Sequence, residues 1–536
     1  MILSICLVSI LAVLYGQFLL SPLIFDDQNI FRLLDENGTQ IFENSTFSLL
    51  GVRSLPYTSF TWTKEWFGSN LLYYRLGNLF LHAAVALALY GFLRCILTHI
   101  YVLKTKNSLT ANQAAALAAF IFALHPLTTY AVGYLVQRTI LMATLFSILA
   151  MWSYAKGSIE NKTAWLWCSV PFYYLAVFCK EHTIMLPAVL VALTAVLHSN
   201  WFEVLIKRKF ILLALTCIAI EVILIKSSIL GTVYELEAKN MLGQDFTPLA
   251  YPLSIITQCG LFFKYLFLWL LPYMPWTSID MREPFARSFW SWHLLGVLTY
   301  IIWGCFAIYL LTKRKHYGLI GFAMFYPWVF FFTELATVRI QEPFVLYRSY
   351  LWFCGSLVGL PIIFASMQRK VLLTVGTLVC LLFSLQSMER LATFSHPILV
   401  WEDAAKLVMD KKNIQGQERI YYNLARHQYL NELLEPAEVN INIALSIDPD
   451  FAQAHAIYGA ILIKKNQWAD AIAEYTISRD LNARRGEPPD STYLLGRARA
   501  YEASGALQKA ADDYLEACRI NFKVCEFLRK SATVIP

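Results

Sequence analysis

The chain has 536 residues, of which 57% are hydrophobic and only 15% are charged, and its mean hydropathy is +0.50. Because about a quarter of the residues of a soluble domain are charged, this composition excludes a single soluble globule, a disordered chain and a fibrous repeat. The net charge of +7 lies in short basic clusters between apolar runs, which is not the pattern of a nucleic-acid-binding protein.

Charged residues are unevenly distributed along the chain. The last 136 residues, which begin at Trp401, contain 36 of them, whereas the first 400 residues contain 45. We therefore expect a membrane-embedded part followed by a C-terminal domain of soluble composition. The expected boundaries are a transmembrane domain over 1–390, a linker helix over 391–415 and a repeat domain over 416–536.

Twelve apolar stretches approach the length of a membrane helix, which is about 20 residues. We expect the first to be a retained span with a cytoplasmic N-terminus, not a cleaved signal peptide. In chain order the stretches cover 1–20, 72–94, 112–127, 138–155, 163–179, 183–199, 210–228, 251–272, 291–312, 317–333, 347–367 and 371–388.

Basic clusters between these stretches predict the topology, because such clusters favour the cytoplasmic side. The clusters are Arg94 to Lys106, Lys156 to Lys162, Lys207 to Lys209, Lys313 to Lys315 and Arg369-Lys370. Three stretches separate Lys209 from Lys313, yet both belong on the same side, so one stretch should not cross. We expect 251–272 to be a re-entrant or interfacial helix, which leaves eleven spans and an external C-terminal domain.

Alanine residues recur at fixed offsets in the C-terminal part, which indicates a helical repeat. Ala437 and Ala471 are 34 residues apart, and Ala510 follows after 39, which is one period plus a short insertion around Gly486. Small residues at these places let two helices of a hairpin pack closely, and the period is typical of tetratricopeptide repeats. We expect about three repeats that bind a partner; the alternative is that they only stabilise or dimerise the chain.

The eleven cysteines include no Cys-X-X-Cys motif and indicate no zinc site. Cys518 and Cys525 are seven residues apart, so on one continuous helix their Cα atoms would be roughly 10 Å apart. That distance is too long for a disulfide, and we expect none between them.

Two adjacent carboxylates, Asp26 and Asp27, follow the first apolar stretch at the start of an external loop over 21–71. A carboxylate at a dry interface has a raised pKa and can take a proton from a hydroxyl nucleophile. The alternative is a solvated cap for the next turn. Side by side, the pair could also hold a divalent metal, although nothing in the sequence requires one.

Six cations lie at the external mouths of different spans, against the positive-inside trend. Such a set predicts an anion site, and phosphate is the expected anion. The six are Arg53, Arg75, Arg138, Lys180, Lys264 and Arg348. The alternative for each is an internal ion pair, for instance of Lys180 with Glu181 or of Arg348 with Glu342.

Two further features lie near this expected site. Arg75, Asn78 and His82 are spaced i, i+3 and i+7, so they share one helix face, and an ionisable group as deep as His82 is a candidate for function. The external stretch Pro56 to Trp66 is aromatic and amphipathic, which predicts a helix lying on the membrane. These features would suit a lipid-linked phosphate donor.

Several blocks, in this order, resemble the transmembrane and tetratricopeptide-repeat-containing protein O-mannosyltransferases and their bacterial relatives. The blocks are Arg53-Ser-Leu-Pro-Tyr-Thr, Tyr74 to His82, Phe122-Ala-Leu-His125-Pro126, Val136-Gln137-Arg138, Lys180-Glu181-His-Thr-Ile-Met-Leu-Pro187, Thr257-Gln258 to Leu271-Pro272, and Arg348-Ser-Tyr350-Leu. The resemblance covers essentially the whole chain. It adds four supporting residues to the expected site, namely His125, Gln137, Glu181 and Tyr350.

The resemblance implies an all-α, polytopic GT-C fold and an inverting glycosyltransferase. The implied donor is a sugar on a polyprenyl phosphate, the implied acceptor is a protein hydroxyl, and the catalytic acid falls on Asp26 or Asp27. The short repeat array favours a bacterial inner-membrane enzyme with a periplasmic repeat domain that glycosylates pilin or another exported protein. In a eukaryote the repeats would lie in the lumen of the endoplasmic reticulum.

Three other functions fit parts of the sequence. A lipid-linked oligosaccharide ligase or polymerase would transfer a preassembled glycan, so the size of the donor would distinguish it. A non-catalytic scaffold would use the repeats alone and would not depend on Asp26 or Asp27. A transporter would use the intramembrane charges as a solute path, but the two halves of the chain show no inverted repeat.

Overall fold

A computed structural model describes residues 2–27, 33–34, 40–41, 45–100, 109–232, 249–290, 293–340, 342–363, 367–411, 414–486, 490–521 and 525. Parts of the expected loop over 21–71, of the first basic cluster and of the insertion after Gly486 lie outside these residues. The chain divides into two compact units, Met1–Pro397 and Ile398–Pro536.

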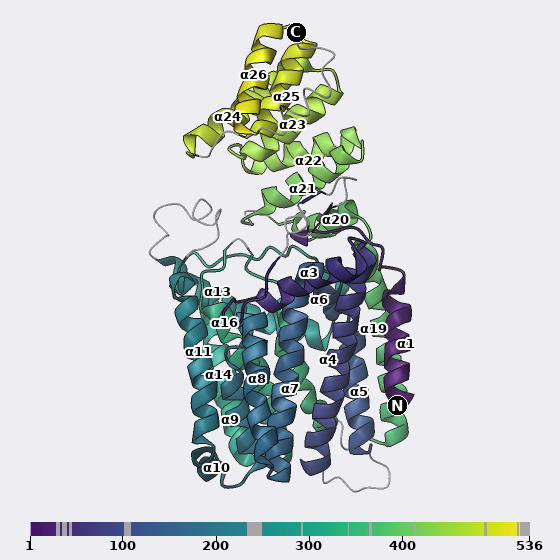
Figure 1. Cartoon of the computed structure of the whole chain (residues 1–536), viewed down its shortest axis with the longest axis vertical. Coiled ribbons are helices and arrows are strands. Elements are labelled where there is room, and N and C mark those ends of the chain that lie inside the picture. The colour runs from purple at the N-terminus through teal and green to yellow at the C-terminus, as the bar shows by residue number, and fades with distance from the viewer. Residues whose placement is uncertain are drawn as a thin grey trace. The chain divides into compact units, whose positions relative to one another are not determined.

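The first unit is a helical bundle, which confirms the expected all-α class (Figure 1). Its helices are α1 (Ile2–Gly16), α3 (Ser54–Phe67), α4 (Leu71–Ile100), α5 (Ala111–Leu124), α6 (Thr129–Val132), α7 (Arg138–Glu160), α8 (Thr163–Cys179), α9 (Leu186–Leu197), α10 (Trp201–Lys207), α11 (Lys209–Ile225), α13 (Ala250–Leu270), α14 (His293–Lys313), α15 (Lys315–Phe330), α16 (Phe332–Leu335), α17 (Ser349–Cys354), α18 (Leu360–Ile363) and α19 (Arg369–Thr393).

Short 3-10 turns and one pair of strands connect these helices. The strands β1 (Leu33–Leu34) and β2 (Gln40–Ile41) pair antiparallel. The turns are η1 (Pro126–Thr128), η2 (Leu135–Gln137), η3 (Glu181–Thr183), η4 (Ser227–Ile229), η6 (Met274–Trp276), η7 (Leu346–Arg348) and η8 (Gly355–Val358).

Within the described chain, six helices are long and apolar enough to cross a membrane, and the chain is an integral membrane protein. A seventh crossing results if α5 and the segment to Val132 form one span, which bends by 54° at Pro126. Proline lacks the backbone donor that would continue the helix, which explains the bend. Other expected spans form shorter helices, such as the 15 residues of α1, so the count of eleven spans stays a prediction.

Three of the basic clusters meet at one end of the bundle, as the positive-inside interpretation predicts. Arg208, between α10 and α11, donates a hydrogen bond to Ser158 Oγ of α7 at 2.9 Å. Arg314, between α14 and α15, donates to the carbonyl of Ser199, between α9 and α10. In Figure 1 this end carries α10, and α3 lies across the other end. Which end faces the cytoplasm stays a prediction.

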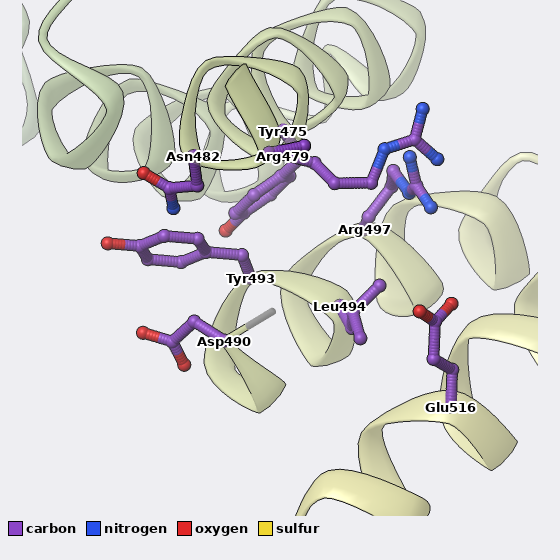
Figure 2. A pocket seen from close by; sticks show the side chains of 9 residues that line it. Tyr475, Arg479, Asn482, Asp490, Tyr493, Leu494, Arg497 and Glu516 are labelled. Carbon is purple, nitrogen blue, oxygen red and sulfur yellow. The ribbon is translucent and has the colours of Figure 1, made fainter. Parts of the chain in front are cut away.

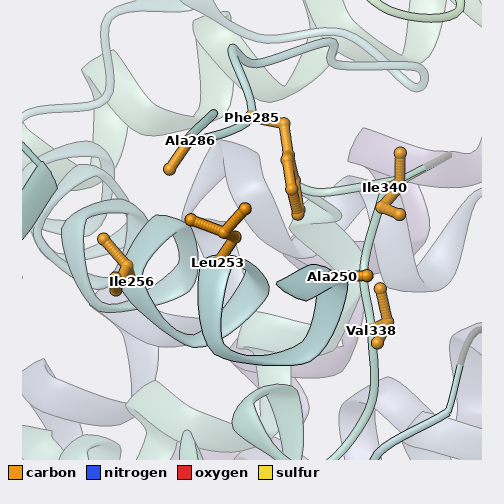
Figure 3. Packing of buried hydrophobic residues seen from close by; sticks show 7 residues of the cluster. All are labelled: Ala250, Leu253, Ile256, Phe285, Ala286, Val338 and Ile340. Atoms are coloured by element: carbon orange, nitrogen blue, oxygen red, sulfur yellow. The ribbon is translucent and has the colours of Figure 1, made fainter. Parts of the chain in front are cut away.

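The first turns of α13 pack against two loops. One loop precedes α14 and the other follows α16, and together with α13 they form a small apolar core (Figure 3). The buried members of this core are Ala250, Leu253, Ile256, Phe285, Ala286, Val338 and Ile340.

The middle of α13 and the segment that follows α13 lie at the same end of the bundle. Its middle crosses the first turn of α14, since a Cβ added at Gly296 would meet the Gly260 backbone at 2.7 Å. After α13, the carbonyl of Thr277 accepts a hydrogen bond from Arg390, near the end of α19, at 3.1 Å. The end of α14 and the start of α19 carry basic clusters. Gly296 and Arg390 lie at the other ends of these two helices, so both contacts lie at the end of the bundle away from those clusters. The arrangement favours the non-crossing helix predicted for 251–272, although a length of 21 residues would allow a crossing.

Helix α3 is the amphipathic helix predicted from the aromatic stretch. It contacts α4, α7 and α8 and buries one face that includes Pro56 and Phe60. On its other face Trp62 and Trp66 are exposed, and their rings stack with centroids 6.4 Å apart. An exposed tryptophan pair on such a helix is typical of a membrane interface.

The second unit begins in α20 (Pro397–Val408) and continues as three helix pairs. They are α21 (Gln417–Leu430) with α22 (Leu434–Ile447), α23 (Ala452–Lys464) with α24 (Trp468–Arg484), and α25 (Ser491–Ala503) with α26 (Leu507–Ile520). Ala437, Ala471 and Ala510 of the repeat pattern are buried, and the ring of Tyr475 packs against Gly459. The helical hairpins are present, whereas their assignment as tetratricopeptide repeats stays a prediction.

The expectation for the C-terminal cysteines is wrong. Cys518 and Cys525 form a disulfide with their Cα atoms 5.0 Å apart. The expectation assumed one continuous helix through both residues, but α26 ends at Ile520.

Candidate active site

The two adjacent aspartates have different surroundings. Asp27 is completely buried, and its carboxylate accepts backbone N–H bonds from Val136 at 2.9 Å and from Leu135 at 3.2 Å. Asp26 is partly exposed, and its backbone N–H donates to the hydroxyl of Tyr134 at 3.1 Å. The geometry therefore favours Asp26 as the carboxylate that can reach a substrate and Asp27 as an anchor.

Arg75 completes this anchor. Its guanidinium donates to the carbonyls of Ser21 and Pro22 after α1 and, at 2.9 Å, to the carbonyl of Gly133 before α7. Burial raises the pKa of Asp27 to about 7, while the charge of Arg75 and the backbone N–H bonds oppose that rise. Arg75 thus joins the two segments that Asp27 also joins, which favours a structural role over phosphate binding.

The guanidinium group of Arg138 also donates its hydrogen bonds to groups of the protein itself. Its Nε donates to Asn78 Oδ1 at 2.9 Å, its Nη2 to the carbonyl of Tyr74 at 2.7 Å, and its Nη1 to Ser59 Oγ at 3.1 Å. The guanidinium also lies 4.0 Å from the centroid of the Phe60 ring. These contacts fix α3 and α4 on the first turn of α7, and they favour a structural role for Arg138 and Asn78.

Two ion pairs flank Lys180. Arg53 pairs with Glu181 through two hydrogen bonds, and Arg348 Nη1 donates to Glu334 Oε2 at 2.7 Å. Glu334 is 1% exposed and also contacts His182 Nε2 at 3.1 Å. The suggested pair of Lys180 with Glu181 is not formed, because Glu181 is engaged by Arg53.

Lys180 is 6% exposed and forms no ion pair with any described residue. Burial, together with the repulsion of Arg53 and Arg348, lowers its pKa well below the usual range, although Glu181 opposes this effect. A buried ammonium group without an acidic partner is costly unless an anion joins it. Lys180 is therefore the best candidate among the six cations for binding an anion.

Two tyrosines connect Lys180 to Asp26. Lys180 Nζ lies 6.0 Å from the centroid of the Tyr347 ring, and the rings of Tyr347 and Tyr134 meet edge to face at 5.8 Å. Burial raises the pKa of Tyr347 to about 12, and the carboxylate of Asp26 is close enough to add to that rise. The carboxylate, the two rings and the lysine thus border one region at the α3 end of the bundle.

The remaining expected residues lie elsewhere or serve packing. Lys264 pairs with Glu283, which is not among the charged residues described around Lys180. His82 contacts the Tyr350 hydroxyl at 2.7 Å, and His125 contacts the carbonyl of Trp269 at 3.1 Å, both in the bundle interior. Gln137 is buried in η2. These contacts favour supporting roles.

Sequence reasoning missed Tyr134, Tyr347 and Glu334. An acid at position 334, directly after an apolar stretch, is the kind of signal that marks function in membrane proteins, and it could have been singled out. The two tyrosines carried no such signal, because aromatic residues make up 15% of this chain.

The described residues contain no group of three or more His, Cys, Asp and Glu side chains that could hold a metal ion. Both carboxylate oxygens of Asp27 accept backbone N–H bonds, so the aspartate pair does not converge on a shared metal position. A divalent metal stays a prediction without structural support.

A separate hollow of about 220 Å³ lies within the second unit, between α24, α25 and α26. Figure 2 shows its lining, which combines Tyr475 and Tyr493 with Arg479 and Arg497. Asp513 fixes Arg497 through two hydrogen bonds, of 2.7 and 2.8 Å. Aromatic and guanidinium groups of this kind are frequent in protein-recognition sites.

No protein-family model matches the chain. The chain is similar to the human protein O-mannosyl-transferase TMTC4, with 24% identity over 298 residues, which cover 53% of this chain and 35% of the human protein. The chain thus spans about a third of the length of this curated relative. The similarity indicates a distant relationship to that family.

Proposed function

We propose that this protein is an integral-membrane, inverting glycosyltransferase. It transfers a sugar from a polyprenyl-phosphate donor to a serine or threonine hydroxyl of an exported protein. The observation that carries the proposal is that Asp26 and Lys180 lie at the two ends of one pair of touching rings. Asp26 contacts Tyr134, Lys180 lies 6.0 Å from the Tyr347 ring, and the two rings meet edge to face. A base and an anion site on either side of one small region suit group transfer from a phosphate ester. The distant similarity to an O-mannosyl-transferase supports a sugar as the transferred group.

In the proposed reaction the Asp26 carboxylate accepts the proton of the acceptor hydroxyl. The hydroxyl oxygen forms a bond to the anomeric carbon, and the bond between that carbon and the phosphate oxygen breaks on the opposite face. The electron pair moves to the phosphate, whose charge Lys180 and Arg348 stabilise, so that no general acid is needed. Attack opposite the leaving group inverts the anomeric configuration.

The other charged residues have positioning roles in this proposal. The pair of Arg53 with Glu181 holds the segment beside Lys180, and Glu334 positions Arg348 by accepting its hydrogen bond. Arg75 and Arg138 fix the segments that carry Asp26 and α3. The polyprenyl tail lies among membrane lipids against the apolar helices, near the exposed tryptophans of α3.

The second unit is proposed to dock the acceptor, and the hollow lined by Tyr475 and Tyr493 is the place where we expect it. The proposed setting is the bacterial inner membrane with this unit in the periplasm and pilin among the acceptors, or the endoplasmic reticulum with this unit in the lumen. The disulfide in this unit agrees with an oxidising compartment.

The test is the intact mass of exported and pilus proteins from the native host after deletion of the gene. Loss of a hexose- or pentose-sized increment, restored by the wild type and by Glu65→Gln but not by Asp26→Asn, supports the proposal. Glu65 is a matched control because it is an exposed acid on α3. Full restoration by Asp26→Asn would contradict the catalytic role and favour a scaffold, and loss of a larger increment would favour an oligosaccharide ligase.

A further inference from the structure

Tyr347 occupies a position that no role in the proposed chemistry explains. It is partly exposed, in the middle of η7, between buried Leu346 and buried Arg348. Three groups surround its ring: Tyr134 at 5.8 Å, Arg348 Cζ at 5.9 Å and Lys180 Nζ at 6.0 Å. Two of these groups are cations at the proposed phosphate site, and the third leads to Asp26.

Tyr134 and Tyr347 together form an aromatic wall, and Tyr134 contacts Asp26, the proposed base. Its hydroxyl accepts the backbone N–H of Asp26 at 3.1 Å, and its ring meets the Phe25 ring edge to face at 5.9 Å. The sequence of groups along the wall is therefore Asp26, Tyr134, Tyr347 and Lys180. An inverting transfer places the base and the leaving phosphate on opposite sides of the sugar, so the sugar must lie between the two ends of this series.

We infer that the ring of Tyr347 forms a wall of the sugar subsite, between the base at Asp26 and the phosphate-binding Lys180. The inference rests on the proposed function and adds the residue that contacts the sugar itself. The face of an aromatic ring carries partial negative charge, and the C–H bonds of a sugar ring carry partial positive charge, so the two surfaces attract each other. The nearby cations would add to this contact by holding the phosphate to which the sugar is attached.

The test separates sugar binding from phosphate binding with two lipids. Full-length protein in lipid nanodiscs is titrated with polyprenyl phosphate and with polyprenyl-phosphate mannose, and bound lipid is counted by native mass spectrometry. Tyr347→Leu should weaken binding of the mannose lipid by about two- to tenfold, the usual worth of one aromatic contact, and leave polyprenyl phosphate binding unchanged. Lys180→Gln should weaken both lipids.

Tyr347→Phe keeps the ring and should behave as the wild type. Tyr273→Leu is the matched control, because Tyr273 is exposed in the loop after α13. If Tyr347→Leu does not yield monodisperse protein, Tyr347→Met serves in its place. Equal loss of both lipids, or no loss of either, would overturn the sugar-wall role while the proposed function stands. Failure of the wild type to bind either lipid would overturn the proposed function itself.

Discussion

The carboxylate of Asp27 accepts a hydrogen bond from the backbone N–H of Val136 at 2.9 Å, although 109 positions separate the two residues. This bond ties the segment after α1 to the turn that begins α7. Arg75 reinforces it by donating to carbonyls of both segments. The neighbouring Asp26 lies beside this anchor, against Tyr134, so the two aspartates of one dipeptide have separate tasks.

Because Asp26 is the proposed base and Asp27 holds two segments together, we expect Asp26→Asn to lower the transfer rate and Asp27→Asn to lower the stability. Asp26→Asn should lose about 10²–10⁴ in transfer rate without loss of stability, because it removes only the base. Asp27→Asn should lower the free energy of unfolding by about 1–3 kcal/mol, because its amide group cannot accept both N–H bonds, and should keep most activity. Transfer assays and thermal unfolding of the two purified variants check this, and a greater loss of rate for Asp27→Asn would contradict the assignment.

Asp27 should also make stability depend on pH. Its pKa is raised from 3.8 to about 7 in the folded protein, so the folded state holds the proton more tightly than the unfolded state. The stability from this group is therefore fully present below the unfolded pKa and is lost as the pH rises through about 7. Melting temperatures across this range should fall for the wild type and for Glu65→Gln, and should change less for Asp27→Asn. Parallel pH profiles would show that Asp27 does not titrate in this range.

Donor binding should depend on pH through Lys180. Burial and the charge of Arg53 lower the pKa of Lys180 well below the usual range, and a bound anion should raise that pKa again because it stabilises the charged form. Affinity for polyprenyl phosphate should therefore fall as the pH rises through that lowered pKa. Lys180→Arg keeps its charge and should flatten the profile, and an unchanged profile in that variant would assign the titration to another group.

The buried pair of Arg497 and Asp513 should stabilise the second unit only as a pair. Asp513→Ala leaves a buried guanidinium without its partner, which typically costs about 3–5 kcal/mol. Asp480→Ala removes the partner of Arg479, an exposed pair, and should cost little. Limited proteolysis of the full chain, followed with a C-terminal tag, measures both; equal sensitivity of the two variants would exclude a special role for the buried pair.

The disulfide predicts the labelling pattern of the second unit. In intact cells a maleimide polymer should not modify the wild-type unit, because both cysteines of this unit are bonded. Cys518→Ser frees Cys525, which should then become modified from the outside if the unit is external. Modification of Cys525 only after the cells are lysed would place the unit in the cytoplasm and contradict the proposed topology.

Several properties follow from the sequence because they depend on local composition. The apolar content and the charge contrast at Trp401 predict a membrane part and a soluble part, and the structure divides at Pro397. The alanine spacing predicts hairpins because helix pairing needs small residues at regular intervals. The amphipathic stretch that became α3 was recognisable for the same reason.

The composition of the candidate site was decided by tertiary structure. Six cations looked equivalent in the sequence, yet the fold gives them different partners. Arg53, Lys264 and Arg348 form ion pairs, Arg75 and Arg138 donate to backbone carbonyls, and Lys180 forms no ion pair with a described residue. Tyr347 and Tyr134 are more than 200 positions apart and meet only because their turns pack together. The partners of a buried polar group lie wherever the fold brings a donor or acceptor, and that choice has no local signature in the chain.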